Sequence, residues 1–281
     1  MPIKCAFCSK SLPDSAATCT GCGGAVSLRK KLKAKLKVKL VRALGYKPPP
    51  PPPPTPPITP EEVIWSALST RKALARIAAR GVSVTSVIDV GASDGRWSEI
   101  AMSIFPDARY LLVEAQDGHL PALKDFAAAH PNADFVIAAA GDKVGDVFFD
   151  DANLFGGIAH KTGGPVVKKV PMVTLDSEVA SRQLPGPYLL KLDTHGFEVP
   201  ILNGAGAVLK SAAVVVIETY NFHITPESLL FHEMCEFMGK LGFRVIDVSE
   251  PLWRQHDQAF WQMDLFFVPS DDPALAHVTY G

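Results

Sequence analysis

The pattern of hydrophobic and polar positions becomes regular after about residue 84. Short apolar runs there alternate with segments of helical periodicity, which is typical of a sheet wound with crossover helices. Seven runs predict strands at 86–90, 110–115, 134–139, 188–193, 214–219, 243–248 and 264–269. A loop separates the last two runs, so we expect an antiparallel pair at that edge. The pattern predicts an α/β fold with a mostly parallel sheet and an antiparallel last strand.

A proline-rich stretch precedes this regular region. Residues 48–60 read PPPPPPPTPPITP, and polyproline II geometry would make them a semi-rigid linker of about 40 Å at about 3.1 Å per residue. A helix is expected to follow, because Thr59 and Glu62 form a capping box around Pro60. We expect this helix to end near Arg80, before Gly81. The linker therefore separates residues 1–47 from a domain at 61–281.

Composition and charge support this division. The chain has 281 residues, 47% of them hydrophobic, which suits one large domain or a domain plus appendages. Its net charge is −1, but residues 1–60 carry eleven Lys or Arg against one Asp, about +10, and the remainder carries about −11. The N-terminus lacks an apolar signal core, and no apolar run reaches the roughly 20 residues of a membrane span. We expect a cytoplasmic protein, either free or peripheral to a membrane or an assembly.

The cysteines are concentrated at the N-terminus. Two pairs, each with two residues between the thiols, predict a closed structural zinc site in a zinc ribbon at 1–27, with the ligands Cys5, Cys8, Cys19 and Cys22. Metal binding would supply most of the folding energy of so short a segment. A pair of disulfides is the alternative, although nothing indicates an oxidising compartment. Cys235 stands alone and is interpreted as a core residue.

A basic segment at 28–47 follows the ribbon. The stretch SLRKKLKAKLKVKLVRALGYK holds nine Lys or Arg and no acid, with spacing that fits either a strand or a helix. It is either a solvated tether or an attachment to an anionic surface or a protein partner through residues 1–47. It has no aromatic residue between Leu28 and Gly45, which disfavours a groove for single-stranded nucleic acid.

The first strand runs into the glycine turn VIDVGASDGRW. After Gly91 the glycines of a dinucleotide fingerprint are missing, so a pyrophosphate cradle is not expected. Glu114 ends the second strand, where a carboxylate can accept hydrogen bonds from both ribose hydroxyls. A ribose without phosphates, beside an amino acid chain, describes S-adenosylmethionine. The alternative is an ordinary tight turn with no ligand.

More distant blocks carry a family resemblance. The stretches VIDVGASDGRWSEIA, VEAQ, VTLDS, LLKLDTHGFEVPILNGAGAVL, VVIE and QMDLFFV together resemble the FkbM-type S-adenosylmethionine-dependent methyltransferases, over about residues 84–269. The resemblance implies a Rossmann-like methyltransferase sheet and methyl transfer, typically to a hydroxyl of a sugar or another small acceptor. The family's usual asparagine in the glycine turn is Ser93 here, a departure that bears on the contact to the methionine end of the cofactor.

Candidate site residues follow from these positions. Asp193 ends the fourth strand and is expected to face the sulfonium and the acceptor. His195 is our candidate general base, because its ordinary pKa lies near 6.5, with Asp193 positioning it or the acceptor. A histidine that only caps a helix is the alternative. Cofactor contacts are predicted for Asp89, Gly91, Ala92, Ser93, Gly95, Glu114, Asp142 and Asp193, with Asp142 near the adenine.

Other residues receive weaker predictions. Glu218, Tyr220, Asn221 and His223 follow the fifth strand and are candidates for the acceptor pocket, whereas Glu198 has a structural explanation at a helix start. The insertion between the third and fourth strands is expected to form an accessory hairpin with a glycine-rich lid. A metal site on Asp150, Asp151, His160 and Asp193 has no spacing that selects it.

Three functions fit the sequence. The first is an S-adenosylmethionine-dependent O-methyltransferase of a saccharide or a similar small acceptor. The second is an RNA methyltransferase that grips phosphates with the ribbon and the lysines, which the acidic catalytic domain disfavours. The third is a non-catalytic scaffold on a methyltransferase fold.

Overall fold

The computed structural model of the chain describes residues 3–4, 11–12, 65–160 and 167–280. The chain divides into two compact units, residues 1–57 and 58–281. In the first unit, β1 (Ile3–Lys4) pairs with β2 (Ser11–Leu12) in antiparallel register. The predicted zinc ligands, the basic segment and the proline-rich linker lie outside the described residues.

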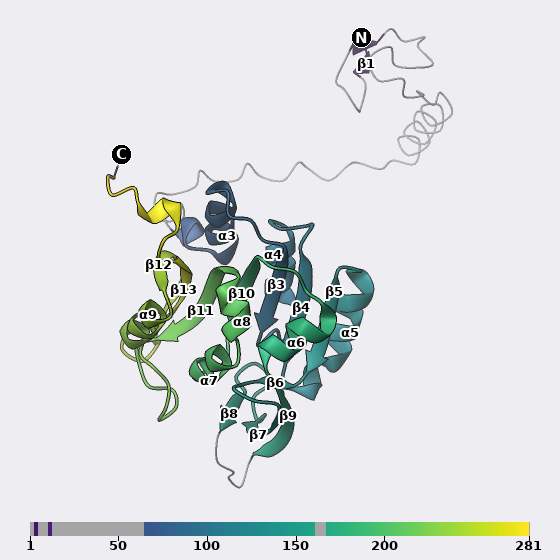
Figure 1. Cartoon of the computed structure of the whole chain (residues 1–281), viewed down its shortest axis with the longest axis vertical. Coiled ribbons are helices and arrows are strands. Elements are labelled where there is room, and N and C mark those ends of the chain that lie inside the picture. Colours follow the sequence, from purple (N-terminus) through teal and green to yellow (C-terminus); the bar gives the residue numbers. More distant parts are fainter. Residues whose placement is uncertain (1–2, 5–10, 13–64, 161–166, 281) are drawn as a thin grey trace, which may run out of the picture. The chain divides into compact units, whose positions relative to one another are not determined.

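A seven-stranded sheet forms the centre of the second unit (Figure 1). Its order is β12-β13-β11-β10-β3-β4-β5, and all pairs are parallel except those made by β13. The seven predicted strands are confirmed as β3 (Ser86–Val90), β4 (Arg109–Glu114), β5 (Ala133–Ile137), β10 (Tyr188–Leu192), β11 (Ala212–Tyr220), β12 (Phe243–Trp253) and β13 (Phe260–Pro269). The predicted antiparallel pair is also confirmed. β13 lies between β11 and β12, so β12 forms the edge.

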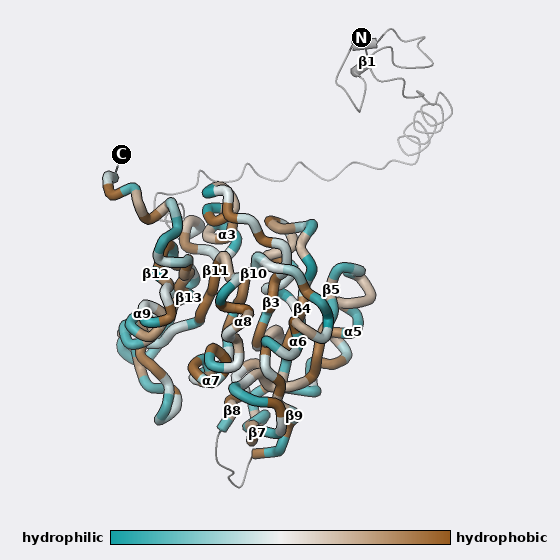
Figure 2. The backbone as a smooth tube through the Cα atoms, viewed as in Figure 1, coloured by the Kyte–Doolittle hydropathy of each residue, from teal (hydrophilic) through white to brown (hydrophobic). Residues whose placement is uncertain are grey.

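Helices cover both faces of this sheet, as expected for a sheet buried on both sides. One face packs against α3 (Thr70–Ala79), α4 (Arg96–Met102) and α5 (Leu120–Ala129). The other packs against α6 (Leu175–Arg182), α7 (Glu198–Asn203), α8 (Gly206–Lys210) and α9 (Phe231–Lys240). Alternate residues of one strand serve the two faces, so Val87 joins the first cluster and Ile88 the second. Figure 2 shows the hydrophobic residues concentrated along the central strands.

The helix predicted after the linker ends where expected. α3 stops at Ala79, and Gly81 has a φ of +80°. Residues 65–67 are also helical, but the helix is interrupted at 68–69, where the Ser69 side chain accepts a hydrogen bond from the backbone N–H of Lys72 and begins α3. The predicted capping residues at 59–62 lie outside the described ranges. Cys235 packs half-buried against the core, as predicted.

The insertion after the third predicted strand forms a second, four-stranded sheet. Its strands are β6 (Ala139–Ala140), β7 (Gly145–Asp150), β8 (Ile158–His160) and β9 (Lys168–Val173), in the order β6-β9-β7-β8. The predicted hairpin is β7 paired with β8. Figure 1 shows this accessory sheet beyond the carboxyl end of β3, which brings the turn at 151–157 to the same edge as the glycine turn.

Candidate active site

The glycine turn leads from β3 into α4 with an unusual backbone. Gly91, Ser93 and Gly95 all have positive φ, at +73°, +54° and +89°. A Cβ on Gly91 would lie 1.9 Å from the carbonyl oxygen of Asp193, so the close approach of the two strand ends requires glycine. A Cβ on Gly95 would lie 2.5 Å from the ring of Phe126. Steric constraints therefore account for both glycines.

A cavity of about 300 Å³ opens beside this turn, at the carboxyl ends of β3, β4 and β10. Open α/β sheets bind ligands at this position. Its lining includes the predicted residues Gly91, Ala92, Ser93, Glu114, Asp193 and His195. Apolar residues from 138–140 and from the turn at 151–157 complete the wall. Gly95 shapes the turn but does not line the cavity.

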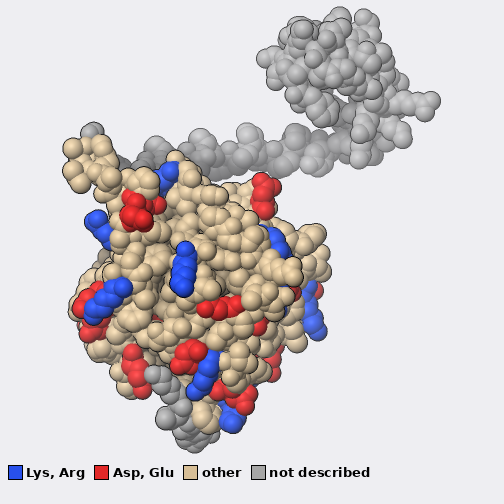
Figure 3. Space-filling view, in the orientation of Figure 1, with Lys and Arg blue, Asp and Glu red and all other residues tan. Residues whose placement is uncertain are grey.

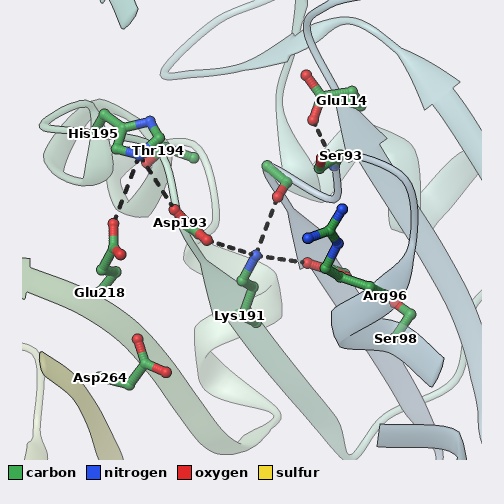
Figure 4. A network of polar contacts seen from close by, with 12 residues as sticks. Ser93, Arg96, Ser98, Glu114, Lys191, Asp193, Thr194, His195, Glu218 and Asp264 are labelled. Carbon is green, nitrogen blue, oxygen red and sulfur yellow. Dashed lines mark hydrogen bonds and ion pairs between the residues drawn. The ribbon is translucent and has the colours of Figure 1, made fainter. Parts of the chain in front are cut away.

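Glu114 holds the turn in place. Its side chain is 6% exposed, and Oε2 accepts a hydrogen bond of 2.7 Å from the backbone N–H of Ser93 (Figure 4). Oε1 accepts a second bond, of 2.8 Å, from the N–H of Gln116. A carboxylate oxygen has two lone pairs, so both oxygens can accept a further donor from a ligand.

The cationic side chains that line the cavity are already paired. Arg96 contacts Asp94 at 2.6 Å, and Lys191 contacts Asp89 at 3.1 Å. Neither is left to neutralise a phosphate. This donor set fits a nucleoside without phosphates, held by one acid and flanked by apolar side chains, which is the chemistry of S-adenosylmethionine.

Two predicted cofactor residues lie elsewhere. Asp89 is fully buried inside β3, where it accepts a hydrogen bond of 2.7 Å from Ser98 Oγ and does not line the cavity. Asp142 is exposed and also outside the lining. The chain leaves β5 at Ile137 and enters the accessory sheet at Ala139, which carries Asp142 away from the cavity. The cavity lining therefore does not support these two predicted contacts, and residues 138–140 form the part of the wall where Asp142 was expected.

Lys191 is a central residue that our sequence analysis missed. Its buried Nζ lies 3.1 Å from Asp89 Oδ1, 3.1 Å from the carbonyl oxygen of Gly91 and 3.3 Å from Asp193 Oδ2. Burial alone would lower the lysine pKa, but the charges of Asp89 and Asp193 raise it above its ordinary value. The sequence does contain a signal for this role, because a single lysine within an apolar strand is buried and therefore needs partners of opposite charge or hydrogen-bond acceptors.

Three polar side chains converge at the rim of the cavity (Figure 4). His195 Nε2 lies 3.7 Å from Asp193 Oδ1 and 3.8 Å from Glu218 Oε2. The positive φ of His195, +51°, turns its ring toward these carboxyls at the ends of β10 and β11. The opposite ring nitrogen, Nδ1, lies 3.2 Å from the carbonyl oxygen of Gly157. The structure thus brings the two predicted catalytic residues together with Glu218.

The carboxyl groups of this cluster are electrostatically unequal. Burial opposes the ionisation of Asp193, but Lys191 and His195 hold its pKa below the ordinary value. The pKa of Glu218 is raised well above its ordinary value by burial and by the charge of Asp193. Burial, then Asp193, also raises the pKa of Asp264 on β13, to about 7. Separated pKa values within a cleft are typical of acid and base sites.

Other candidates have structural explanations. Glu198 accepts hydrogen bonds from the N–H of Gly196 at 3.0 Å and from Thr194 Oγ1 at 3.1 Å, so it stabilises the turn before α7. Asp151 pairs with Lys168 at 2.7 Å. Within the described ranges, the group of side chains close enough to share a metal ion is Asp193, His195 and Glu218, rather than the set suggested by sequence.

The strand order, the reversed β13 and the cavity at the carboxyl ends of β3, β4 and β10 define a Rossmann-like methyltransferase fold. Residues 89–245 match the family of methyltransferase FkbM domains. This match covers more than half of the chain, and the chain belongs to that family. No curated protein matches the sequence.

Solved structures that resemble this chain include two methyltransferases and a pre-rRNA processing protein. Methyltransferase FkbM from Methylobacillus flagellatus is 12% identical with a TM-score of 0.43, covering 64% of this chain and 43% of that one. The Burkholderia thailandensis 1,6-didemethyltoxoflavin-N1-methyltransferase, with bound S-adenosylhomocysteine, is 11% identical with a TM-score of 0.39, covering 88% and 93%. Fibrillarin from Methanococcus jannaschii is 13% identical with a TM-score of 0.43, covering 73% and 77%. This chain therefore spans less than half the length of the Methylobacillus protein.

Proposed function

We propose that this protein transfers the methyl group of S-adenosylmethionine to a hydroxyl oxygen of a saccharide or a similar small acceptor. The observation that carries the proposal is the position of His195 and Asp193, which both line the cavity and lie 3.7 Å apart at its rim. A hydroxyl placed there would stand between a proton acceptor and the cofactor. Among the described residues, every helix is too short or too polar to cross a membrane.

The residues around the cavity have separate roles in holding the cofactor. Glu114 would accept the ribose hydroxyls, and the backbone of Gly91, Ala92 and Ser93 would pack against the nucleoside. When bound, S-adenosylmethionine supplies a methyl group made electrophilic by the adjoining sulfonium. The protein contributes alignment of the reacting atoms and exclusion of water.

His195 is the proposed general base. A hydrogen bond from Nδ1–H to the carbonyl of Gly157 would leave Nε2 with a free lone pair for the acceptor proton. Asp193 stays ionised beside Lys191 and stabilises the resulting imidazolium. In the proposed transfer the oxygen–methyl bond would form as the sulfur–methyl bond breaks, with the electron pair left on sulfur, and His195 would take the hydroxyl proton.

Aromatic rings next to His195 support an acceptor with flat apolar faces. The ring of Tyr220 lies 6.5 Å from that of His195, Trp261 lies 5.9 Å from Tyr220, and Phe222 stacks on Trp261 at 5.3 Å. Sugar rings present C–H faces that pack on such rings while their hydroxyls bond to polar tips. Of the other predicted acceptor residues, Asn221 bonds to Phe260 and His223 to Ser228, away from the cavity lining.

Isothermal calorimetry with S-adenosylhomocysteine tests the cofactor site. Wild type is expected to bind at micromolar strength, and Glu114→Ala to lose binding. Glu99→Gln, an exposed change on α4 outside the cavity, is the control and should bind normally. Absence of binding to wild type would refute the proposal. Mass spectrometry of cellular glycans with and without the protein, seeking a gain of one CH₂ group, tests the acceptor class.

The RNA alternative receives no support from the face of the protein drawn in Figure 3. Figure 3 shows Lys and Arg scattered singly among Asp and Glu on the visible face, without a continuous basic track. RNA binding would require such a track and would weaken steeply with salt. We propose instead that the predicted zinc ribbon and basic segment attach the cytoplasmic enzyme to an anionic surface or a protein partner. Salt-dependent binding to acidic vesicles that a chain lacking residues 1–47 fails to show would test this.

A further inference from the structure

We propose that Asp193, His195 and Glu218 bind a divalent metal ion that takes oxygen and imidazole ligands, such as Mn²⁺ or Mg²⁺. The inference rests on the proposed methyl transfer and replaces the base role of His195 by a ligand role, because the ion would hold the acceptor hydroxyl at the rim of the cofactor cavity. Three observations carry it: the convergence of the donor atoms, the groups that orient them, and the local charge.

The donor atoms lie close to the spacing that a metal ion needs. One nitrogen or oxygen from each of the three residues lies within 4.8 Å of the others. His195 Nε2 is 3.7 Å from Asp193 Oδ1 and 3.8 Å from Glu218 Oε2. Neighbouring ligands of an octahedral ion, each about 2.1 Å from the metal, stand about 3 Å apart. Side-chain shifts of less than about 1 Å would close the site.

Each donor is oriented from behind by another group. Nδ1 of His195 faces the Gly157 carbonyl at 3.2 Å, which fixes the ring and leaves the Nε2 lone pair directed at the two carboxyls. Metal-binding histidines almost always donate their second N–H in this way. Glu218 receives hydrogen bonds from Tyr220 Oη and Gln262 Nε2. Lys191 holds Asp193 through Oδ2, so Oδ1 is the oxygen left facing His195.

The charge at this point favours a cation. Three electron-pair donors face one another, and the nearby Lys191 lies on the far oxygen of Asp193. Asp264 pairs opposite Glu218 in the β11–β13 register and adds a further carboxyl. The side chains of Asp193 and His195 are 36% and 26% exposed, so an ion and its water ligands have access from the cavity. Carboxylate oxygens with one imidazole suit Mn²⁺ and Mg²⁺ better than soft metals.

A bound ion would change how the acceptor is activated. A hydroxyl coordinated to a divalent cation loses its proton more readily, and that proton would leave to solvent. The oxygen–methyl bond would form as the sulfur–methyl bond breaks, with the electron pair remaining on sulfur. His195 Nε2 would then be a ligand, whereas in the metal-free mechanism it is the base. The two roles exclude one another and can be separated by experiment.

The experiment titrates Mn²⁺ into the full chain, freed of metals with EDTA and saturated with S-adenosylhomocysteine, and follows free Mn²⁺ by electron paramagnetic resonance. We expect binding at one site with a Kd below about 1 mM, weakened at least tenfold by His195→Ala and by Glu218→Gln, and less strongly by Tyr220→Phe. Asp146→Asn, an exposed change in the accessory sheet, is the matched control and should bind like wild type. Cys5→Ser with Cys8→Ser should also leave Mn²⁺ binding unchanged.

Affinity for S-adenosylhomocysteine, measured on the same variants, separates the two proposals. Glu218→Gln, which lies outside the cavity lining, should keep the wild-type affinity within about threefold, and His195→Ala should keep the wild-type circular dichroism spectrum, which shows that both variants fold. If wild type binds S-adenosylhomocysteine but not Mn²⁺, or if both variants bind Mn²⁺ as wild type does, the metal site is refuted and the His195 base mechanism stands. If wild type does not bind S-adenosylhomocysteine, the proposed function itself fails.

Discussion

Replacing Lys191 by methionine would test the electrostatic centre of the fold. The substitution keeps the length and apolar stem of the side chain but removes the ammonium that contacts Asp89, Asp193 and the carbonyl of Gly91, at 3.1 to 3.3 Å. Asp89 is fully buried, and after the substitution it would keep, among the described residues, the hydrogen bond that Ser98 Oγ donates to it. A buried carboxylate would therefore lose its counter-charge.

The magnitude follows from how each carboxylate can respond. Removing one partner of a buried ion pair costs about 3–5 kcal/mol of unfolding free energy. Asp193 is 36% exposed and can be hydrated, so the loss concentrates at Asp89 and should lie near the lower end, at about 3 kcal/mol. In the double variant Lys191→Met, Asp89→Asn, no buried charge is left uncompensated. We expect it to be more stable than Lys191→Met alone by at least about 1 kcal/mol.

Urea unfolding at pH 7, followed by circular dichroism, measures these differences. The wild type, both single variants and the double variant complete a thermodynamic cycle, so the coupling between Lys191 and Asp89 is obtained directly. A loss below about 1 kcal/mol for Lys191→Met would refute the reasoning. A double variant whose loss equals the sum of the single losses would also refute it, because the two charges would then act independently.

Three further predictions concern single contacts. Gly91→Ala should unfold the domain or weaken S-adenosylhomocysteine binding at least about tenfold, because the new Cβ would lie 1.9 Å from the carbonyl oxygen of Asp193. Normal affinity by calorimetry would contradict this. Asp247 is partly buried, which opposes ionisation, but two hydrogen bonds from Arg76 lower its pKa below the usual 3.8. The ionised Asp247 carboxylate therefore stabilises the fold above about pH 4, and this stabilisation is lost as pH falls through its folded-state pKa. Asp247→Asn should lower the free energy of unfolding by about 1–3 kcal/mol at pH 7 and by less at pH 3. An equal loss at both pH values in urea titrations would contradict this. Gln116 Nε2 donates hydrogen bonds to the carbonyls of Asn153 and Leu154, at 3.2 and 3.0 Å, and so holds the turn at 151–157. Gln116→Ala should therefore release S-adenosylhomocysteine faster in stopped-flow measurements. An unchanged release rate would show that this turn does not retain the ligand.

The central sheet was predictable because its strands are buried on both faces. The stretches at 86–90 and 188–192 are fully buried along their length, and such strands appear in a sequence as short, nearly continuous apolar runs. The antiparallel position of the last strand was also predictable, because the segment before it has the pattern of a loop instead of a crossover helix. The accessory sheet was predicted as a hairpin, but its pairing of β6 with β9 joins residues about 30 positions apart and has no local signal.

The site residues that lie near the end of a parallel strand could be predicted from the sequence. Gly91, Glu114, Asp193 and His195 each stand within a few positions of a strand end, and parallel strands end at one edge. Gln262 and Asp264 were missed because they reach the cluster from β13, whose antiparallel register sets Asp264 opposite Glu218. A register between distant strands depends on tertiary packing rather than on local pattern.

Asp89 and Asp193 together show what decides whether an aspartate near a strand end stabilises the fold or faces the cavity. Both follow an apolar residue near the end of a buried strand, and the sequence analysis assigned both to the cofactor. Asp89 lies one residue inside the end of β3, in register with Lys191 on β10, so its carboxylate is enclosed and needs that cation. Asp193 lies one residue beyond the end of β10, so its carboxylate reaches the cavity and keeps one oxygen free of Lys191. A shift of two positions relative to the strand end thus separates a structural ion pair from a group available for chemistry, and Lys191 connects the two.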